Sequence, residues 1–245
     1  MMEEEGLWIF GYGSLCWNPG FEYKKSMTGY VKGFCRRFWQ GNTTHRGTED
    51  KPGRVVTLIE DKDEITYGRV FQIKGETALS YLKMRECTLG GYLTKFSTFY
   101  SRDGKSNFPV LIYIATNNNK HWMGEAPLQT IAMQILECEG PSGHNAEYLL
   151  RLADFMHRYV PEAIDEHLFI LEKIVRTQIK ELNICINKLM GNRVFALELL
   201  EIDEELVTGP NDEENNDNVP VNARPENSFE YISRVPTKLL RCLKP

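Results

Sequence analysis

The hydrophobic pattern of the chain changes once, between residues 115 and 126, and this change restricts the fold more than any other feature. Before it, short runs rich in β-branched and aromatic residues are separated by turn-forming residues, which is typical of β-strands. We expect strands at residues 7–10, 29–40, 53–60, 65–73, 92–100 and 108–115. The acidic stretch EDKDE, residues 60–64, is expected to be a hairpin loop, and residues 75–86 a helix between strands.

The part of the chain after the change has the pattern of helices. Apolar residues follow the i, i+3, i+4, i+7, i+8 spacing of one helix face at Leu128, Ile131, Ala132, Ile135 and Leu136. Further helices are expected at 145–160 and from Pro161 to residue 182, because proline suits the first turn of a helix. His167 is expected on the surface of that last helix, without a catalytic role. Strands followed by helices without a linker predict a single α+β domain.

The composition changes again after Leu206. Residues 208–228, TGPNDEENNDNVPVNARPENS, are polar and acidic and contain almost no large apolar side chains. Such a segment buries too little apolar surface to offset the entropy cost of ordering. We therefore expect a folded domain at residues 1–206 and an acidic, largely disordered tail at 207–245.

We predict that residues 209–227 are dispensable. A chain that ends before Gly209 should keep its activity and its melting temperature nearly unchanged, because residues 209–227 have almost no large apolar side chains to contribute to a core. Functional assays and thermal melting of the full-length and truncated proteins measure both quantities. A large fall in either would show that the tail packs on the domain.

Charge and cysteine usage exclude several classes of protein. The net charge of -5 disfavours nucleic acid as a partner. The six cysteines form no Cys-x-x-Cys pair and have no histidine at metal-ligand spacing, which argues against disulfides and zinc and for a reducing compartment. No signal peptide and no apolar run of membrane-spanning length is visible. We expect a cytosolic protein that binds a small molecule and no membrane.

The segment GYGSL, Gly11 to Leu15, follows an apolar strand directly. Two glycines let the backbone turn sharply and approach a ligand, and successive N–H groups in such a turn can bind an anion. The dinucleotide pattern Gly-x-Gly-x-x-Gly fails because residue 16 is cysteine, and the Gly-x-Ser-x-Gly nucleophile pattern is absent. The alternative is a plain turn between a strand and a loop.

Two further segments contain candidate binding residues. The first is residues 36–58, where arginine side chains suit the capture of a carboxylate, although charge at a strand edge is the alternative explanation for each arginine. In GPSGHNAEYL, Asn145 is expected to cap a helix and Ser142 can hold a polar ligand, with capping alone as the alternative. The basic candidates of residues 36–58 are Arg36, Arg37, His45, Arg46 and Arg54. Functional residues are more frequent in loops, which favours His45 and Arg46 over the others.

Glu86 lies where a helical run ends before a Gly-Gly turn, in KMRECTLGGYLTK. If Leu79 and Leu82 face inward, Glu86 points to the same buried side, seven and four residues further on. Partial desolvation favours the protonated form of a carboxyl group, so such a glutamate can act as a base near neutral pH. A purely structural glutamate is the alternative.

Taken together, these segments resemble the ChaC family of glutathione-specific γ-glutamylcyclotransferases. The resemblance runs in one order from about residue 8 to residue 180. It is carried by WIFGYGSL, GY, RRFWQGNTTHRGT, KPGRVVTLIE, YGRVFQI, YLKMRECTLGGY, LIYIAT, GPSGHNAEYL and DEHLFILEK.

The resemblance implies a γ-glutamylcyclotransferase-like fold, a mixed β-barrel with flanking α-helices. It implies a lyase reaction without cofactor or metal, in which glutathione is split into 5-oxoproline and Cys-Gly and Glu86 is the general acid and base. A monomer or a homodimer is expected. The expected substrate-binding residues are Ile9, Phe10, Gly11, Tyr12, Gly13, Ser14, Arg37, Tyr92 and Tyr148.

Two other functions remain open from the sequence. One is a broader γ-glutamyl cyclotransferase that acts on γ-glutamyl amino acids or amines. The other is a non-catalytic binding protein with the same fold, although a pure binder gains nothing from a half-buried base at Glu86.

Overall fold

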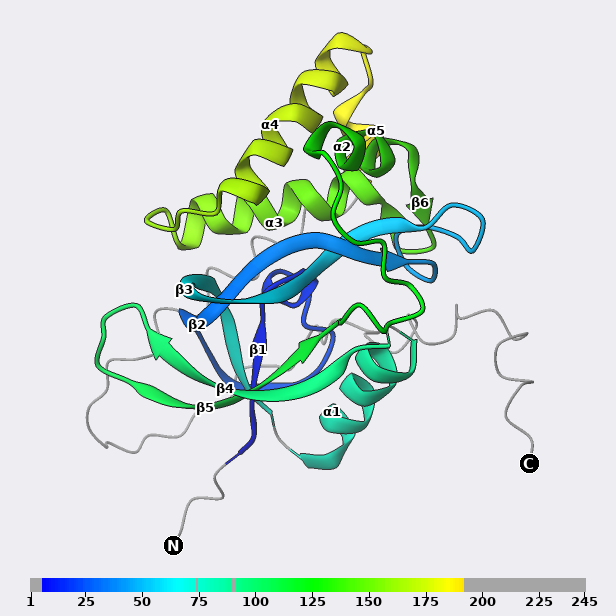
Figure 1. The fold of residues 1–245 in the computed structure, drawn as a ribbon. Helices are drawn as coiled ribbons and strands as arrows, with labels where there is room; N and C mark the ends of the chain where they lie inside the picture. The colour runs from blue at the N-terminus through cyan, green and yellow to red at the C-terminus, as the bar shows by residue number, and fades with distance from the viewer. Residues whose placement is uncertain (1–5, 74, 90, 192–245) are drawn as a thin grey trace, which may run out of the picture.

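The computed structural model describes residues 6–73, 75–89 and 91–191, and in this part of the chain five strands close into a barrel (Figure 1). The strand order is β1-β3-β2-β4-β5, and β1 closes the barrel by pairing parallel to β5 while the other pairs are antiparallel. The predicted α+β mixed barrel is confirmed. The proposed boundary at residue 206 and the tail lie outside the described residues. The barrel strands are β1 (Trp8–Gly11), β2 (Tyr23–Asn42), β3 (Gly53–Ile73), β4 (Leu93–Ser101) and β5 (Asn107–Ile114).

Most helices cover one side of the barrel. Helices α2, α3 and α4 pack over β2 and β3, whereas α1 lies on the opposite side of the barrel (Figure 1). Among the described residues, no helix combines the length and the apolar content needed to span a membrane. The remaining elements are a short helix at Ser14–Cys16, α1 (Gly75–Leu82), a π-helical turn at Lys83–Leu89, α2 (Leu128–Glu137), β6 (Glu139–Gly140), β7 (Gly143–His144), α3 (Asn145–Tyr159), α4 (Glu166–Glu181) and α5 (Ile186–Met190).

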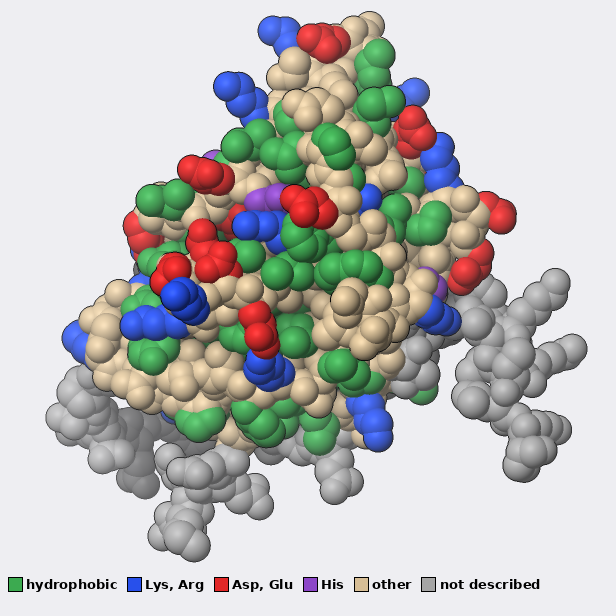
Figure 2. Space-filling view, in the orientation of Figure 1, with side chains coloured by type: hydrophobic (Ala, Val, Ile, Leu, Met, Phe, Trp, Pro, Cys, Tyr) green, Lys and Arg blue, Asp and Glu red, His purple; other side chains and the backbone are tan. Residues whose placement is uncertain are grey.

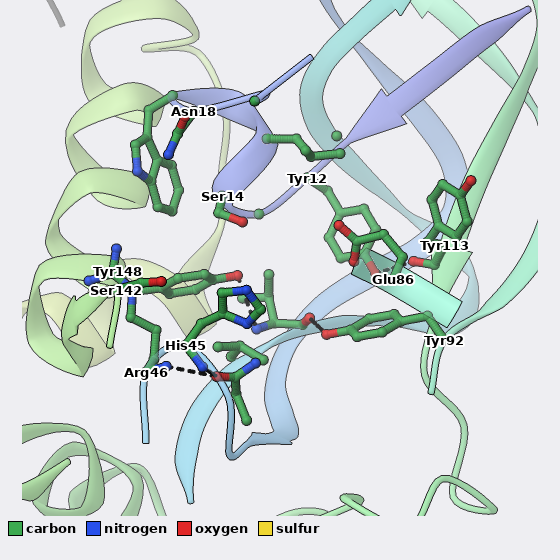
Figure 3. A pocket seen from close by; sticks show the side chains of 18 of the residues that line it. Tyr12, Ser14, Asn18, His45, Arg46, Glu86, Tyr92, Tyr113, Ser142 and Tyr148 are labelled. Atoms are coloured by element: carbon green, nitrogen blue, oxygen red, sulfur yellow. Dashed lines mark hydrogen bonds between the residues drawn. The ribbon is translucent and has the colours of Figure 1, made fainter. Parts of the chain in front are cut away.

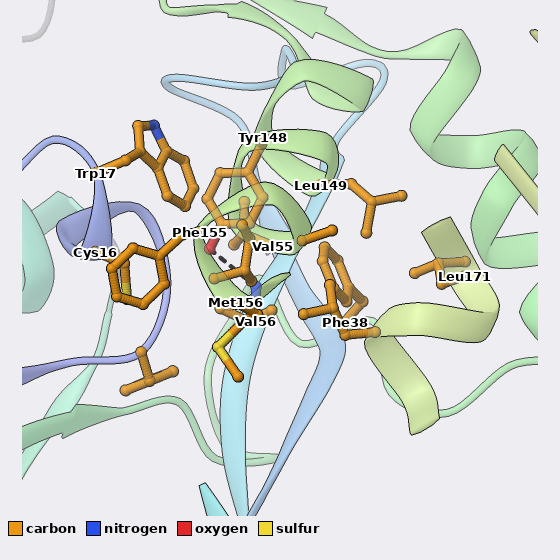
Figure 4. Packing of buried hydrophobic residues seen from close by; sticks show 14 of the residues in the cluster. Cys16, Trp17, Phe38, Val55, Val56, Tyr148, Leu149, Phe155, Met156 and Leu171 are labelled. Atoms are coloured by element: carbon orange, nitrogen blue, oxygen red, sulfur yellow. Dashed lines mark hydrogen bonds between the residues drawn. The ribbon is translucent and has the colours of Figure 1, made fainter. Parts of the chain in front are cut away.

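Two apolar clusters hold these layers together. The larger one joins the barrel interior to the helices, where Phe38 and Val55 pack with Leu149 and Phe155 (Figure 4). The smaller one lies under α1 and contains the fully buried Leu82. The apolar face predicted for α2 is confirmed, because its inward residues Ile131, Ala132 and Ile135 are completely buried.

Strand β3 does not turn back at EDKDE, so the predicted hairpin loop is wrong. Residues 53–73 form one long strand paired with the equally long β2. In this ladder Phe34 faces Glu60 and Lys32 faces Ile65, so residues 61–64 bulge outward opposite a single residue. A bulge places the charged side chains in solvent without reversing the chain.

Helix α4 starts later than the sequence pattern indicates. Pro161 lies in the turn before it, and Asp165 is the N-cap, whose Oδ1 accepts a hydrogen bond from the Leu168 N–H at 3.1 Å. The second carboxylate oxygen of Asp165 binds the buried Arg36 of β2 at 2.8 Å. The barrel therefore fixes the start of α4, which the proline alone does not.

His167 packs against the barrel. Its Nε2 accepts a hydrogen bond from the Phe38 N–H at 3.1 Å, and its ring stacks on the Phe38 ring. Burial, helped by the nearby Arg37 charge, lowers the pKa of His167 from 6.5 to about 4. His167 is not among the described residues that line the cavity presented below.

We predict that the free energy of unfolding falls as the pH drops from about 6.5 toward 4, because unfolded His167 takes up a proton that folded His167 excludes. The loss should approach about 3 kcal/mol once the pH is below both pKa values. Urea titrations across this pH range measure the free energy of unfolding. His167→Gln keeps a hydrogen-bond acceptor without a titrating ring and should show a shallower pH dependence; equal slopes in both proteins would contradict the prediction.

The surface carries both signs of charge. On the face shown in Figure 2, acidic and basic side chains are interspersed over the barrel and the helices. A nucleic-acid-binding face normally carries a continuous basic stripe, and this face does not have one.

Candidate active site

A cavity of about 320 Å³ opens at the end of the barrel, between the loop after β1, the loop between β2 and β3, the π-helical turn and α3. This volume lies near the lower end of the range for small-molecule sites, roughly 300–1,000 Å³. Most of its lining side chains are aromatic or polar (Figure 3). The polar ones are Tyr12, Ser14, Asn18, Asn42, Thr44, His45, Arg46, Tyr81, Glu86, Tyr92, Tyr113, Ser142 and Tyr148.

The structure brings most of the predicted site residues together at this cavity. They come from the end of β1 and the loop after it, from the π-helical turn and Tyr92 three positions beyond it, and from α3. Because these segments are far apart in the sequence, only the closed barrel makes them neighbours. The predicted residues that line the cavity are Phe10, Gly11, Tyr12, Gly13, Ser14, Glu86, Tyr92 and Tyr148.

Two predicted substrate-binding residues, Ile9 and Arg37, do not line the cavity. Successive strand residues point to opposite faces, so Ile9 packs in the apolar cluster under α1 while Phe10 faces the cavity. On β2 the alternation directs Arg36 inward, and Arg37 donates from Nη1 to the carbonyl of Arg36 at 2.9 Å. We therefore correct the sequence-based expectation and assign neither residue to the site.

Glu86 is carried by the π-helical turn that continues α1. Leu82 anchors this segment in the smaller apolar cluster, but Leu79 is 39% exposed, so the predicted inward face is wrong at that position. The turn ends where the Gly91 N–H donates to the carbonyl of Cys87 at 3.1 Å and the Tyr92 N–H to that of Glu86 at 2.9 Å. π-Helical turns are frequent at functional sites. This one presents a half-buried Glu86 to the cavity.

Glu86 is the one carboxylate among the described residues that line the cavity. The tyrosines around it are poor proton acceptors. Burial, and then the Glu86 charge, raises the pKa of Tyr12 well above its usual value of 10, and burial raises that of Tyr148. Burial, with Cys87 and Glu86, raises the pKa of Tyr113 to about 12. At neutral pH these phenols remain protonated and can act only as hydrogen-bond partners.

Two tyrosine hydroxyls are used to hold the cavity wall. Tyr12 donates to the carbonyl of Tyr113, and Tyr92 donates to the carbonyl of Val56 at 3.1 Å. The Tyr148 hydroxyl differs, because it accepts from the Val56 N–H at 3.4 Å and its own proton has no acceptor among the described residues. It lies against Gly13, where an added Cβ would come within 2.6 Å of the Tyr148 oxygen.

Asn145 is not the helix cap that the sequence suggests. The N-cap of α3 is His144, whose Nδ1 accepts from the Ala146 N–H at 3.1 Å. Asn145 is completely buried and binds both backbone groups of Arg54, with its Oδ1 2.7 Å from the N and its Nδ2 2.8 Å from the O. These two hydrogen bonds hold the start of α3 against β3 beside the cavity.

Sequence reasoning missed Asn18, Tyr81 and Tyr113 as cavity residues. Tyr81 precedes the buried Leu82 in α1, and Tyr113 lies in β5. Nothing in the local sequence distinguishes them from core tyrosines. The described residues contain no group of three or more His, Cys, Asp or Glu side chains suited to a metal ion.

The closed barrel and this cavity define a γ-glutamylcyclotransferase-like protein. The sequence model of the ChaC-like protein family matches residues 7–178, so the chain belongs to this family.

Curated relatives and solved structures agree with this assignment. The chain is 52% identical over 181 residues to human glutathione-specific gamma-glutamylcyclotransferase 1, covering 72% of this chain and 82% of the relative. It is 35% identical over 198 residues to the glutathione-specific gamma-glutamylcyclotransferase of Schizosaccharomyces pombe, covering 73% and 96%. A crystal structure of a glutathione-specific γ-glutamyl cyclotransferase from yeast superimposes with a TM-score of 0.64 at 28% identity, covering 71% of this chain and 97% of that one.

Proposed function

We propose that this protein degrades glutathione by cleaving its γ-glutamyl bond, giving 5-oxoproline and Cys-Gly without a metal or a cofactor. The observation that carries the proposal is the position of Glu86, the one described carboxylate lining a cavity that also contains the Gly11–Ser14 loop. The proposal is further supported by relatives at 52% and 50% identity, from human and zebrafish, that are named for this reaction.

The first chemical step is a proton transfer. At neutral pH the α-amine of the γ-glutamyl group is an ammonium ion and cannot attack a carbonyl carbon. Glu86 accepts one proton from it, and the amine nitrogen then forms a bond to the γ-carbonyl carbon, which closes a five-membered ring. Because nucleophile and electrophile belong to one molecule, holding it in the folded shape contributes up to ~7–11 kcal/mol.

The second step breaks the amide bond to cysteine. The γ-carbonyl oxygen carries negative charge until the C–N bond breaks, and two donors meet where this oxygen can lie. One is the Gly13 N–H, which has no acceptor among the described residues, and the other is the Tyr148 hydroxyl. Donors of this kind are worth about 3 kcal/mol each. Glu86 returns its proton to the departing amine, and the ring nitrogen gives up its second proton, which leaves the amine of Cys-Gly as an ammonium ion. No water is consumed.

The two alternatives differ in what they predict for substrates. A broader γ-glutamyl cyclotransferase would release 5-oxoproline equally well from glutathione and from γ-glutamyl-alanine. A binding protein with this fold would release it from neither.

One assay tests the proposal. Purified protein is incubated with glutathione or γ-glutamyl-alanine, with EDTA or with added metal ions, and 5-oxoproline is measured. We expect release from glutathione that is independent of EDTA and metals, and much slower release from γ-glutamyl-alanine. Intact glutathione under all conditions would refute the enzyme assignment.

We also propose that the protein works in the cytosol, as a monomer or a homodimer. The cysteines of the described part of the chain, Cys16, Cys35, Cys87, Cys138 and Cys185, are all unpaired. Unpaired thiols suit a reducing compartment.

A further inference from the structure

The end of the cavity away from Glu86 is basic. In Figure 3, Arg46, His45 and Ser142 lie on one side of the cavity and Glu86 with Tyr92 on the other. His45 and Arg46 come from the loop between β2 and β3, and Ser142 from the turn between β6 and β7. The proposed chemistry uses none of these three side chains.

Arg46 has donors that the fold does not use. Its Nη1 binds Glu147 at 2.6 Å and the carbonyl of His144 at 3.0 Å, while Nε and Nη2 have no acceptor among the described residues. Its side chain is only 9% exposed and lines the cavity. Glu147 also binds Arg151 through its other oxygen at 2.8 Å, so one carboxylate is shared between two guanidinium groups. Because Glu147 is shared, it compensates only part of the positive charge of Arg46. A nearly desolvated guanidinium with uncompensated charge binds an anion strongly.

The loop that carries Arg46 is held in place. Asn42 Oδ1 accepts from the N–H groups of His45 and Arg46 at 2.8 and 2.7 Å. The Ser142 N–H donates to the carbonyl of His45 at 2.9 Å. Because the loop is fixed to β2 and to the β6–β7 turn, little entropy is lost when a ligand binds there.

We infer that Arg46 binds the carboxylate of the C-terminal glycine of glutathione and thereby selects the tripeptide over shorter γ-glutamyl compounds. This inference rests on the proposed function. The α-carboxylate of the substrate shares a carbon with the amine that must reach Glu86, so it stays at the Glu86 end. The glycine carboxylate is the other anionic group of glutathione, and it lies at the far end of the molecule, where the cavity is basic.

The competing explanation is structural. Arg46 would then serve only to pin its loop to α3 through Glu147, and the chemistry at the glycine end of the substrate would not matter. Arg151 offers a matched control, because it binds the same carboxylate but is not among the cavity-lining residues.

The first test changes the substrate and leaves the protein intact. The wild-type enzyme is given glutathione or its C-terminal amide, γ-Glu-Cys-Gly-NH2. We expect kcat/KM for the amide to be about 10- to 100-fold lower than for glutathione, which is the effect of losing one hydrogen-bonded ion pair. The change should appear in KM, because the glycine end is remote from the reacting atoms. Equal kcat/KM values would overturn the inference while leaving the proposed function intact.

The second test assigns the effect to Arg46. Arg46→Gln should have a kcat/KM for glutathione about 10- to 100-fold below that of wild type. Within this variant, kcat/KM for the C-terminal amide should be little lower than kcat/KM for glutathione. Arg151→Gln should keep the preference of the wild type for the free carboxylate. Arg46→Lys, which keeps a cation opposite Glu147 but lacks the guanidinium fork, is the second variant. Retained preference in both Arg46 variants, or a preference lost equally in Arg151→Gln, would show a structural role.

A binding measurement separates this inference from the failure of the proposed function. Calorimetry on Glu86→Gln reports affinity without turnover, and it should show about 10- to 100-fold weaker binding of the amide than of glutathione. If wild type releases no 5-oxoproline but Glu86→Gln still prefers the free carboxylate, the proposed reaction is wrong and the role of Arg46 stands. Equal affinities would overturn the role of Arg46.

Discussion

Glu86→Gln is expected to lower kcat for 5-oxoproline release by about 10²–10⁴-fold, near the upper end of this range. The substitution preserves the shape and hydrogen-bonding reach of the side chain but removes the proton acceptor. The ammonium of the substrate cannot attack until it loses a proton, and the buried tyrosines nearby are too weakly acidic to exchange one at neutral pH. Turnover and calorimetric binding of glutathione, measured on the same variant, should show lost catalysis with retained affinity.

His45 provides the comparison for this prediction, since it is the one histidine among the described residues that line the cavity, and histidine is the most frequent general base in enzymes. It lies on the Arg46 side of the cavity, away from Glu86 (Figure 3). His45→Gln should therefore keep most of kcat. A Glu86→Gln variant that retains more than about a tenth of the rate, with a large loss in His45→Gln, would move the role of base to His45.

Gly13→Ala is expected to lower kcat/KM by about 10²-fold, the effect of displacing a reacting group by about 1 Å. The backbone of Gly13 has a φ of -128°, which alanine can adopt, so the obstacle is space. An added Cβ would lie 2.6 Å from the Tyr148 oxygen and 2.8 Å from Cγ2 of Val56. Since both neighbours are buried, the loop must move, and the Gly13 N–H moves with it. Steady-state kinetics and thermal melting measure the two consequences.

A double variant tests this steric reason. Tyr148→Phe removes the oxygen that an alanine at position 13 would meet, so Gly13→Ala should lower the melting temperature less in the Tyr148→Phe background than in wild type. Equal destabilisation in both backgrounds, or an unchanged kcat/KM in Gly13→Ala, would show that the loop tolerates the added methyl group.

Local patterns allowed much of the architecture to be predicted. The spacing of Ile131, Ala132 and Ile135 predicted the buried face of α2, because burying such a face is what makes an amphipathic helix stable. The Gly11–Ser14 segment and Glu86 stood out because each lies at the end of a regular element, where a backbone turn exposes functional groups. The structure places both at the cavity, although their roles stay predictions.

The tertiary structure decided the points where long-range contacts outweigh local preference. EDKDE reads as a turn, but pairing along the whole of β2 keeps β3 extended through it. Asn145 reads as a cap, but its amide satisfies both backbone groups of Arg54 in β3. Pro161 reads as a helix start, but the ion pair between Arg36 and Asp165 sets the start of α4 at Glu166.

The same distinction separates the two ends of the site. Residues 11–14 and Glu86 could be selected from the sequence because short motifs contain them. Local sequence separated Arg46 from Arg36, Arg37 and Arg54 only by its position in a loop, where functional residues are more frequent. The exposure of Arg46 to the cavity depends on Glu147, 101 positions further along the chain, and on the closure of the barrel that brings α3 beside the loop. A sequence determines which side chains have the required chemistry, whereas burial and partners, which only the folded chain defines, determine which of them can reach a substrate.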